Sequence, residues 1–308
     1  MAGRRRLLVL ALAAGAAAAL APVSPAGAGA SAGTHLAGVR RAAHRPSASQ
    51  LASHGGPVET APAVYIDWWG PSWASGFKTG GYSSAAAQAY VTGFFTNVGG
   101  TSWINSTAQY CQGVPRGTTS CAGHPAALHV TNPAGQLKGA WEDTSPVPAS
   151  VSQAGVAAEA ARAAAHFGFD PDATYFVFTP HGVTMSGFGT AWCAWHAATA
   201  SPQGRLAYAF MPYVPDAGAG CGKNFVNRAD DAFGNGYFDG FSVVGGHEYA
   251  EAETDPRPSS GWVAPGGAEN GDKCAWAPTS GDIALADGHR YAVQPLWSNA
   301  ARACVMSA

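Results

Sequence analysis

Six cysteines behind an export leader place the strongest constraint on how this chain can fold. Residues 1–6 (MAGRRR) are basic, residues 7–21 are apolar and uncharged, and residues 26–30 (AGAGA) suit a small-residue cleavage site. This pattern predicts a signal peptide over 1–30 and a secreted, extracellular protein. An even number of cysteines in an exported chain predicts disulfide bonds, so we expect disulfide-stapled loops.

Chain order favours a sequential pairing of the cysteines among the many that are possible in principle. The expected bridges are Cys111–Cys121, Cys193–Cys221 and Cys274–Cys304. The first would close a loop rich in Gly, Pro and Thr, and the last would tie down the C-terminus. Metal binding by cysteine is the rival interpretation, but the sequence contains no CxxC pair.

Composition divides the rest of the chain into a spacer and one domain. Residues 31–62 are rich in Ser, Ala, Gly, His and Pro without apolar periodicity, which predicts a flexible spacer or pro-segment. Residues 63–308 are expected to form a single globular domain. Hydrophobic residues make up 47% of the chain and charged residues only 12%, against about 25% in an average soluble domain. These proportions argue against a disordered chain and against a coiled coil.

The charge pattern excludes some partners. The formal net charge is −2, and the expected domain over 63–308 is more acidic because six arginines lie before it. This domain has no basic stripe, so the phosphates of a nucleic acid would be repelled. No segment after the leader is apolar enough to span a membrane. We therefore expect a protein that binds no nucleic acid and has no membrane span in its mature form. A monomer is also expected.

Short strand patterns alternate with helical ones along the domain. Strands are expected at 64–66, 127–131, 174–179, 205–213 and 290–296. Helices are expected at 83–96, with a serine N-cap, at 150–167, ending at Gly168, and at 241–253, ending before Pro256. This order predicts an α/β or α+β fold, a single layered domain with a mixed sheet.

The segment FSVVGGHEYAEAETD (241–255) gathers one histidine and four acids behind an apolar run. On a helix His247 and Glu251 lie at positions i and i+4, so they share a face and can approach one ion. This is the geometry of the HExxH zinc helix with the second histidine replaced by glutamate, which is an acceptable zinc ligand. Glu248 points about 100° away around the helix and is the candidate general base toward the attacking water. The alternative without a metal site is a solvated acidic helix end with a core histidine.

A third metal ligand must come from elsewhere in the chain. Glu269 is the first candidate and Asp272 the alternative, because both lie in an acidic turn, ENGDKC, that a loop can bring back to the helix. Three residues are auxiliary candidates: His196 in CAWHA, His181 after the strand TYFVFT, and Asp255 at the end of the helix.

The order of these motifs resembles the EXORDIUM-like (phosphate-induced) family of secreted proteins and its bacterial relatives. The resemblance rests on VYIDWWGPSW, TYFVFTPHG, CAWHA, YAFMPY, GGHEYAEAETDP and ENGDKC. In that family a GHE-x-x-E segment is followed by Asn-Pro or Asp-Pro, a Trp, and an acid-x-x-Asp-x-Cys turn. The resemblance implies secretion, the disulfides and a functional role for the acids and histidine of 247–272, without an agreed catalytic activity.

Two functions are compatible with these patterns. The first is a secreted zinc-dependent metallohydrolase, a zincin-like peptidase acting on a peptide or protein substrate. The second is a non-catalytic extracellular binding protein for a cell-wall glycan or a peptide, in which the HExxE helix forms a structural metal or hydrogen-bond site. A coordination shell without an open position would favour the second function.

Overall fold

The computed structural model describes residues 34–38, 48–227, 233 and 235–308. The chain divides into two compact units, Met1–Ser31 and Ala32–Ala308, and the predicted signal peptide lies outside the described residues. Among the helices that the structure describes, none is long and apolar enough to cross a membrane.

A six-stranded mixed sheet forms the centre of the second unit, which confirms the predicted fold class. Its strand order is β1 (Thr34–Gly38), β8 (Trp192–Ser201), β9 (Gly204–Met211), β7 (Ala173–Phe178), β3 (Ala63–Trp69) and β6 (Leu137–Asp143). The four strands from β9 to β6 are parallel, while β8 and β1 are antiparallel to their neighbours. All six residues of β7 are buried, as expected for a central strand with both faces covered.

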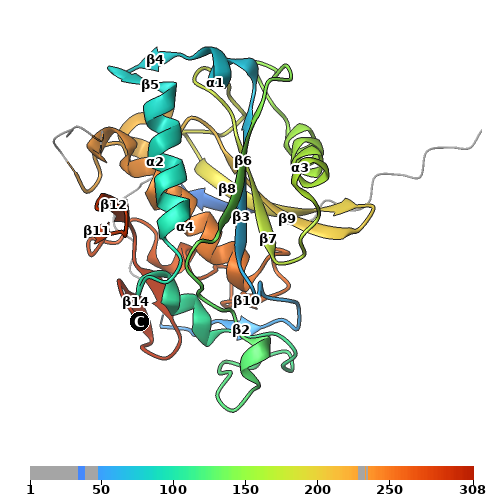
Figure 1. The fold of residues 1–308 in the computed structure, drawn as a ribbon. Helices are drawn as coiled ribbons and strands as arrows, with labels where there is room; N and C mark the ends of the chain where they lie inside the picture. The colour runs from blue at the N-terminus through green and yellow to red at the C-terminus, as the bar shows by residue number, and fades with distance from the viewer. Residues whose placement is uncertain (1–33, 39–47, 228–232, 234) are drawn as a thin grey trace, which may run out of the picture. The chain divides into compact units, whose positions relative to one another are not determined.

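Helices cover both faces of this sheet. In Figure 1, α2 (Ser84–Asn97) and α4 (Asn235–Thr254) lie on one side and α3 (Gln153–Phe167) on the other. The predicted ends hold locally: Ser83 caps α2 by accepting from the Ala86 N–H, and Gly168, with φ 102°, ends α3. However, α4 begins at Asn235 rather than at 241, since the Tyr237 ring stacks on Tyr82 and joins the core.

The remaining elements are short. They are α1 (Pro71–Ser75), the strand pairs β4 (Lys78–Thr79) with β5 (Tyr82–Ser83), β2 (Ala52–Ser53) with β10 (Trp262–Val263), β11 (Gly281–Ala284) with β12 (Arg290–Val293), β13 (Leu296–Ser298) with β14 (Ala303–Val305), and four 3₁₀ turns, η1 (Ile104–Gln109), η2 (Ala126–Leu128), η3 (Val214–Cys221) and η4 (Asp272–Cys274). The strand predicted at 127–131 is wrong, because η2 occupies its start and a single β-bridge joins His129 to Cys111. The strand predicted at 290–296 is divided between β12 and β13.

The sequential cysteine pairing is confirmed. Cys111–Cys121, Cys193–Cys221 and Cys274–Cys304 are all bonded. The second bridge joins β8 to η3, and the third joins η4 to β14. Three disulfides are consistent with a secreted protein.

The prediction of a flexible spacer over 31–62 is wrong for the described part of that segment. Residues 34–38 form β1 along β8, and 52–53 pair with β10. Main-chain bonds and a few widely spaced apolar side chains hold this segment. The Asn299 side chain accepts from the Leu51 N–H and donates to the Leu51 carbonyl, while the Leu51 and Val58 side chains are buried in a cluster with Trp262. Such contacts leave no periodicity in the sequence.

Candidate metal centre

The helix α4 carries the acids and the histidine of the HExxE segment into the interior. Close packing at two glycines makes this possible: a Cβ at Gly246 would lie 2.8 Å from Trp103 Cη2, and one at Gly245 would lie 3.4 Å from Met211 Cε. His247 is 1% exposed, and Glu248 and Glu251 are 0% exposed. The alternative of a solvated acidic helix end therefore does not hold.

The contacts of His247 define which ring nitrogen faces the acids. Gln294 Nε2 donates to the Gly271 carbonyl (2.8 Å), so Gln294 Oε1 is the atom that accepts from His247 Nδ1 at 3.2 Å. With its proton on Nδ1, the neutral ring has a lone pair on Nε2, which lies 3.0 Å from Glu251 Oε1 and 3.6 Å from an oxygen of Asp272. Lone pairs facing one another in a buried site repel, so this arrangement requires a proton or a cation.

The pKa of His247 shows how strongly this arrangement favours a positive charge. Burial lowers that pKa, but the facing carboxylates of Glu251 and Asp272 outweigh burial and hold it well above its usual range. A positive charge at Nε2 is thus favoured, whether a proton or a metal ion supplies it.

His196 reaches the same cluster from β8. Its Nδ1 lies 3.0 Å from Glu248 Oε2 and 3.6 Å from Glu251 Oε2, while its Nε2 lies 3.6 Å from Glu269 Oε2. His196, an auxiliary candidate from the sequence, therefore lies at the centre of the site. Glu248 is the carboxylate that orients its ring.

The acidic turn after the helix completes the cluster. Glu269 is 0% exposed, and burial, followed by repulsion from Glu251 and Asp255, raises its pKa well above the usual range. The Asp272 N–H donates to Glu251 Oε1 (2.8 Å), and the Asp272 side chain accepts from the Glu269 N–H (3.2 Å). The structure thus brings both predicted third ligands to the helix.

Two auxiliary candidates have other roles. Asp255 accepts from the N–H groups of Ser259, Ser260 and Gly261, so it organises the turn after α4. His181 lies outside the buried cluster: its Nδ1 is 2.6 Å from Asp216 Oδ1, and its side chain is 46% exposed.

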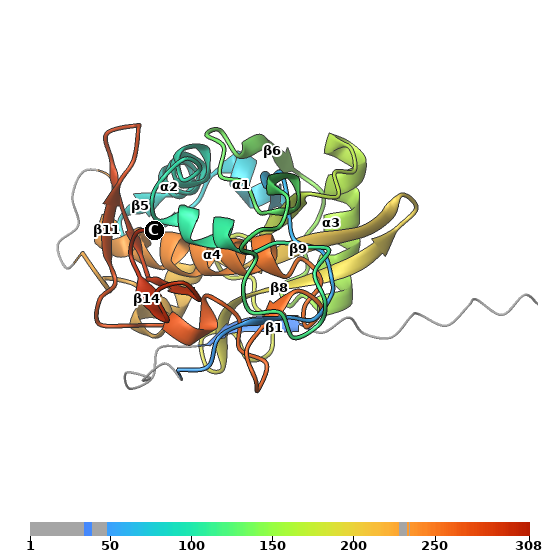
Figure 2. The same cartoon turned by 90° about the horizontal axis from the view of Figure 1, so that it is seen from below.

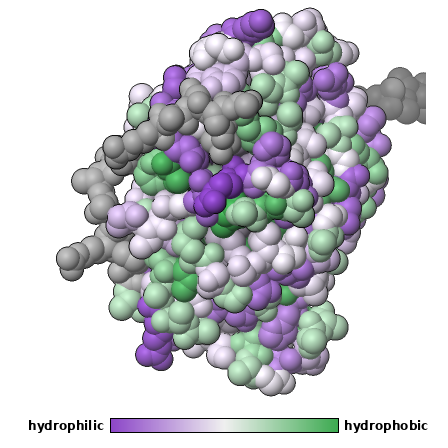
Figure 3. All heavy atoms as spheres, turned by 60° about the vertical axis from the view of Figure 1, so that its left-hand side comes forward, coloured by the Kyte–Doolittle hydropathy of each residue, from purple (hydrophilic) through white to green (hydrophobic). Residues whose placement is uncertain are grey.

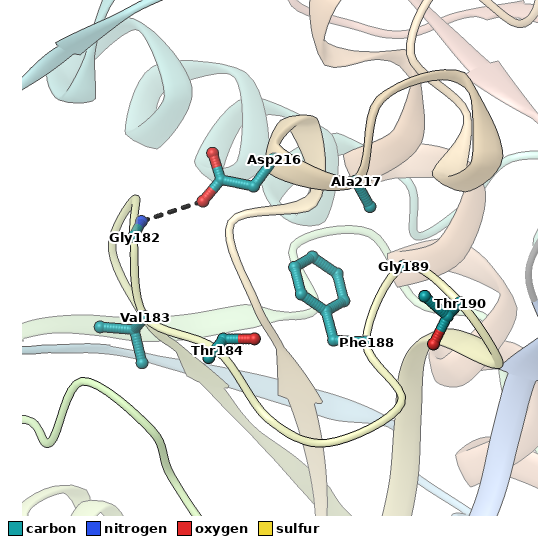
Figure 4. Close-up of a pocket in the computed structure, with 8 residues that line it drawn as sticks. All are labelled: Gly182, Val183, Thr184, Phe188, Gly189, Thr190, Asp216 and Ala217. Carbon is teal, nitrogen blue, oxygen red and sulfur yellow. Dashed lines mark hydrogen bonds between the residues drawn. The ribbon is translucent and has the colours of Figure 1, made fainter.

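A surface hollow lies beside this exposed pair, where β7 and β9 end. Its volume is about 380 Å³, and Figure 4 shows the side chains that line it, with the Gly182 N–H directed at Asp216. On the face that Figure 3 draws, the coloured residues mix hydrophobic and hydrophilic types without a broad hydrophobic patch. Among the described residues, the groups of side chains that could hold a metal ion are instead buried.

In the described part of the chain, two overlapping groups of buried side chains around α4 could hold a metal ion. One consists of His196, Glu251 and Glu269 and the other of His247, Glu248 and Glu251, and within each group the ligand atoms lie within 4.8 Å of one another. Glu251 belongs to both and links β8, α4 and the acidic turn. Sequence reasoning missed Gln294, which lies 47 residues from the histidine it orients.

A second buried acidic group lies on the α3 side of the sheet. Asp67, Asp143 and Glu159 place oxygens within 4.8 Å of one another, and Arg162 pairs with both Asp143 and Glu159. Burial raises the pKa of Asp67 to about 7 and that of Glu159 to about 9. We interpret Asp67 and Glu159 as facing carboxyl groups that share a proton.

Comparisons with protein-family models, with curated proteins and with solved structures find no match for this chain. The resemblance to the EXORDIUM-like family therefore stays a prediction, and the function must be argued from the site itself.

Proposed function

We propose that this protein is a secreted zinc-dependent metallohydrolase of the peptidase class. The observation that carries the proposal is the orientation of the two buried histidines. Each has its Nδ1 engaged, by Gln294 or by Glu248, and its Nε2 facing a carboxylate. A histidine whose other nitrogen is held in this way is typical of metal sites.

The donor set fits zinc. The candidate ligands are the imidazole nitrogens of His247 and His196 and the carboxylates of Glu251 and Glu269, with Asp272 beside His247. A catalytic zinc would take three protein ligands and keep a fourth position for water or substrate. Bound zinc would supply a Lewis acid that polarises a carbonyl group. The positive charge would also offset the repulsion among the buried carboxylates.

Glu248 is the candidate base of this reaction. Its Oε2 accepts from His196 Nδ1, which keeps that ring oriented, and its Oε1 accepts from the Ala37 N–H at 3.0 Å. Oε1 is therefore the atom that can take a proton from an attacking water once the Ala37 N–H has moved away.

A second candidate function is a non-catalytic extracellular binding protein with a structural metal. The observation that favours it is burial: His196, Glu251 and Glu269 are each 0% exposed. A closed shell of this kind is typical of structural sites.

Hydrolysis of a peptide library by the zinc-loaded chain separates the two functions. The enzyme hypothesis expects chelator-sensitive cleavage that Glu248→Gln lowers by roughly 10²–10⁴-fold while zinc stays bound. The matched control is His181→Ala, which removes an exposed histidine outside the cluster and should leave cleavage unchanged. Because the Ala37 N–H occupies Glu248 Oε1, the library is also tested on Ala37→Pro, which lacks that N–H. Bound zinc with no cleavage of any library member by the wild type or by Ala37→Pro would contradict the enzyme and support the binding protein.

A further inference from the structure

The strand β1 lies beside β8, the strand that carries His196 (Figure 2). Its antiparallel register places His35 opposite His196. Two further contacts hold its main chain: the Ala37 N–H donates to Glu248 Oε1 at 3.0 Å, and Trp276 Nε1 donates to the Gly38 carbonyl at 2.7 Å. The main chain of β1 is thus hydrogen-bonded to Glu248, the proposed base, and to Trp276.

The register of β1 shifts where it meets the helix. Ala37 is opposite Ala194, but Gly38 is opposite Trp192, so one residue of β8 is skipped. The shift coincides with the position at which the β1 main chain gives its N–H to Glu248. Glu248 Oε2 in turn lies 3.0 Å from His196, so the Leu36–Ala37 peptide group is one side chain away from a proposed zinc ligand.

We propose that the edge of β8 is a binding site for an extended peptide, and that β1 is its intramolecular occupant. Without β1, the strand β8 would present unpaired main-chain groups, which an added peptide strand satisfies. A second peptide in the place of β1 would direct one N–H at Glu248 and one carbonyl at Trp276. Because these contacts are made by the main chain, the site would accept varied sequences that have a small residue in the place of Ala37, whose side chain is buried in the core.

This proposal extends the proposed function, since it names an extended peptide as the substrate class of the same site. It also explains why Glu248 is occupied in this structure: the strand that blocks Oε1 takes the place of the substrate. As part of the same chain, β1 competes at an effective concentration of roughly millimolar. A free peptide at micromolar concentration should therefore not displace it from the wild-type protein.

The test is the binding of a fluorescent THLAG peptide, the sequence of residues 34–38, to the full chain, measured by anisotropy. Ala37→Pro removes the N–H that Glu248 accepts and should weaken β1, so the peptide should bind about 10- to 100-fold more tightly than to wild type. Ala37→Gly is the matched control, because it keeps the N–H. Trp276→Phe, which removes the donor to the Gly38 carbonyl, should tighten binding in the same direction without a proline.

Unchanged binding by folded Ala37→Pro and Trp276→Phe proteins, checked by circular dichroism, would overturn the proposal. Tighter binding by Ala37→Gly equal to that of Ala37→Pro would also overturn it, since the lost N–H would not be the cause. If Ala37→Pro does not fold, the Trp276→Phe result decides. Zinc content is measured on the same samples. A failure of the zinc proposal can therefore be told apart from a failure of the peptide-site proposal.

Discussion

A substitution at Gly271 tests the packing around the candidate metal centre. Its φ of −72° and ψ of −47° suit any residue, so alanine at this position introduces no backbone strain. The difficulty is space: a Cβ would lie 2.9 Å from His247 Cγ and 3.0 Å from Glu251 Oε1. Both groups are held in place, by Gln294 and by the Asp272 N–H, and cannot move without breaking a hydrogen bond.

Gly271→Ala should therefore displace two proposed ligands at once. Overpacking of this kind costs about 1–3 kcal/mol, which for a domain of this size lowers Tm by roughly 2–12 °C. Misplaced ligands should weaken zinc binding by about 10- to 100-fold, as loss of supporting contacts does in other metal sites. The assays are thermal unfolding without zinc and competition with a fluorescent chelator.

Gly281→Ala is the matched control. A Cβ there would lie 4.0 Å from its nearest neighbour, Met306 Cε, so neither stability nor zinc affinity should fall. Zinc affinity of Gly271→Ala equal to that of wild type would refute the reasoning, because the ligands would then not be where this packing puts them.

Three further predictions concern Gln294 beside His247, the acidic group on the α3 side of the sheet and a disulfide. Gln294→Leu should weaken zinc binding by about 10- to 100-fold in the chelator competition, because His247 loses the acceptor for its Nδ1–H; an unchanged affinity would contradict this role. The raised pKa values of Asp67 and Glu159, about 7 and about 9, mean that the folded state holds protons more tightly than the unfolded state. Their contribution is therefore greatest below the unfolded pKa near 4 and is lost as pH rises toward 9, so urea unfolding should show stability falling between pH 5 and pH 8, and Asp67→Asn should flatten that fall. Cys304→Ser opens the bridge of sequence separation 30 and should cost about 3 kcal/mol in the same assay; a cost near zero would mean that the loop is held by other contacts.

Local patterns in the sequence predict the helix-borne half of the site. His247 and Glu251 lie on one face because they are four residues apart on a helix, and the acidic turn with Glu269 returns to that helix. In contrast, Glu248 contacts Ala37, 211 residues earlier in the chain, and no local pattern records that contact. His196 and Gln294 are likewise placed by tertiary packing.

The same distinction applies to the fold. The strand TYFVFT is predicted because it is apolar and buried on both faces, and the cysteines pair in chain order. The strand β1 is missed because its hydrogen bonds are made by main-chain groups, which any residue type supplies, and because a single small residue, Ala37, is described as packing into the core. The early start of α4 is missed because aromatic packing at Tyr237 overrides the Asn-Gly sequence that favours a turn.

The zinc content of the purified full chain, measured by mass spectrometry beside its variants, tests the proposed centre most directly. The proposal predicts zinc bound to the wild type and to His181→Ala, and its loss from His247→Ala and from His196→Ala, since each of the latter removes a proposed ligand. Wild-type protein that holds no transition metal and cannot be loaded with zinc would contradict the metal centre. Zinc retained by both His247→Ala and His196→Ala would contradict it equally, because the ion would then lie elsewhere in the protein.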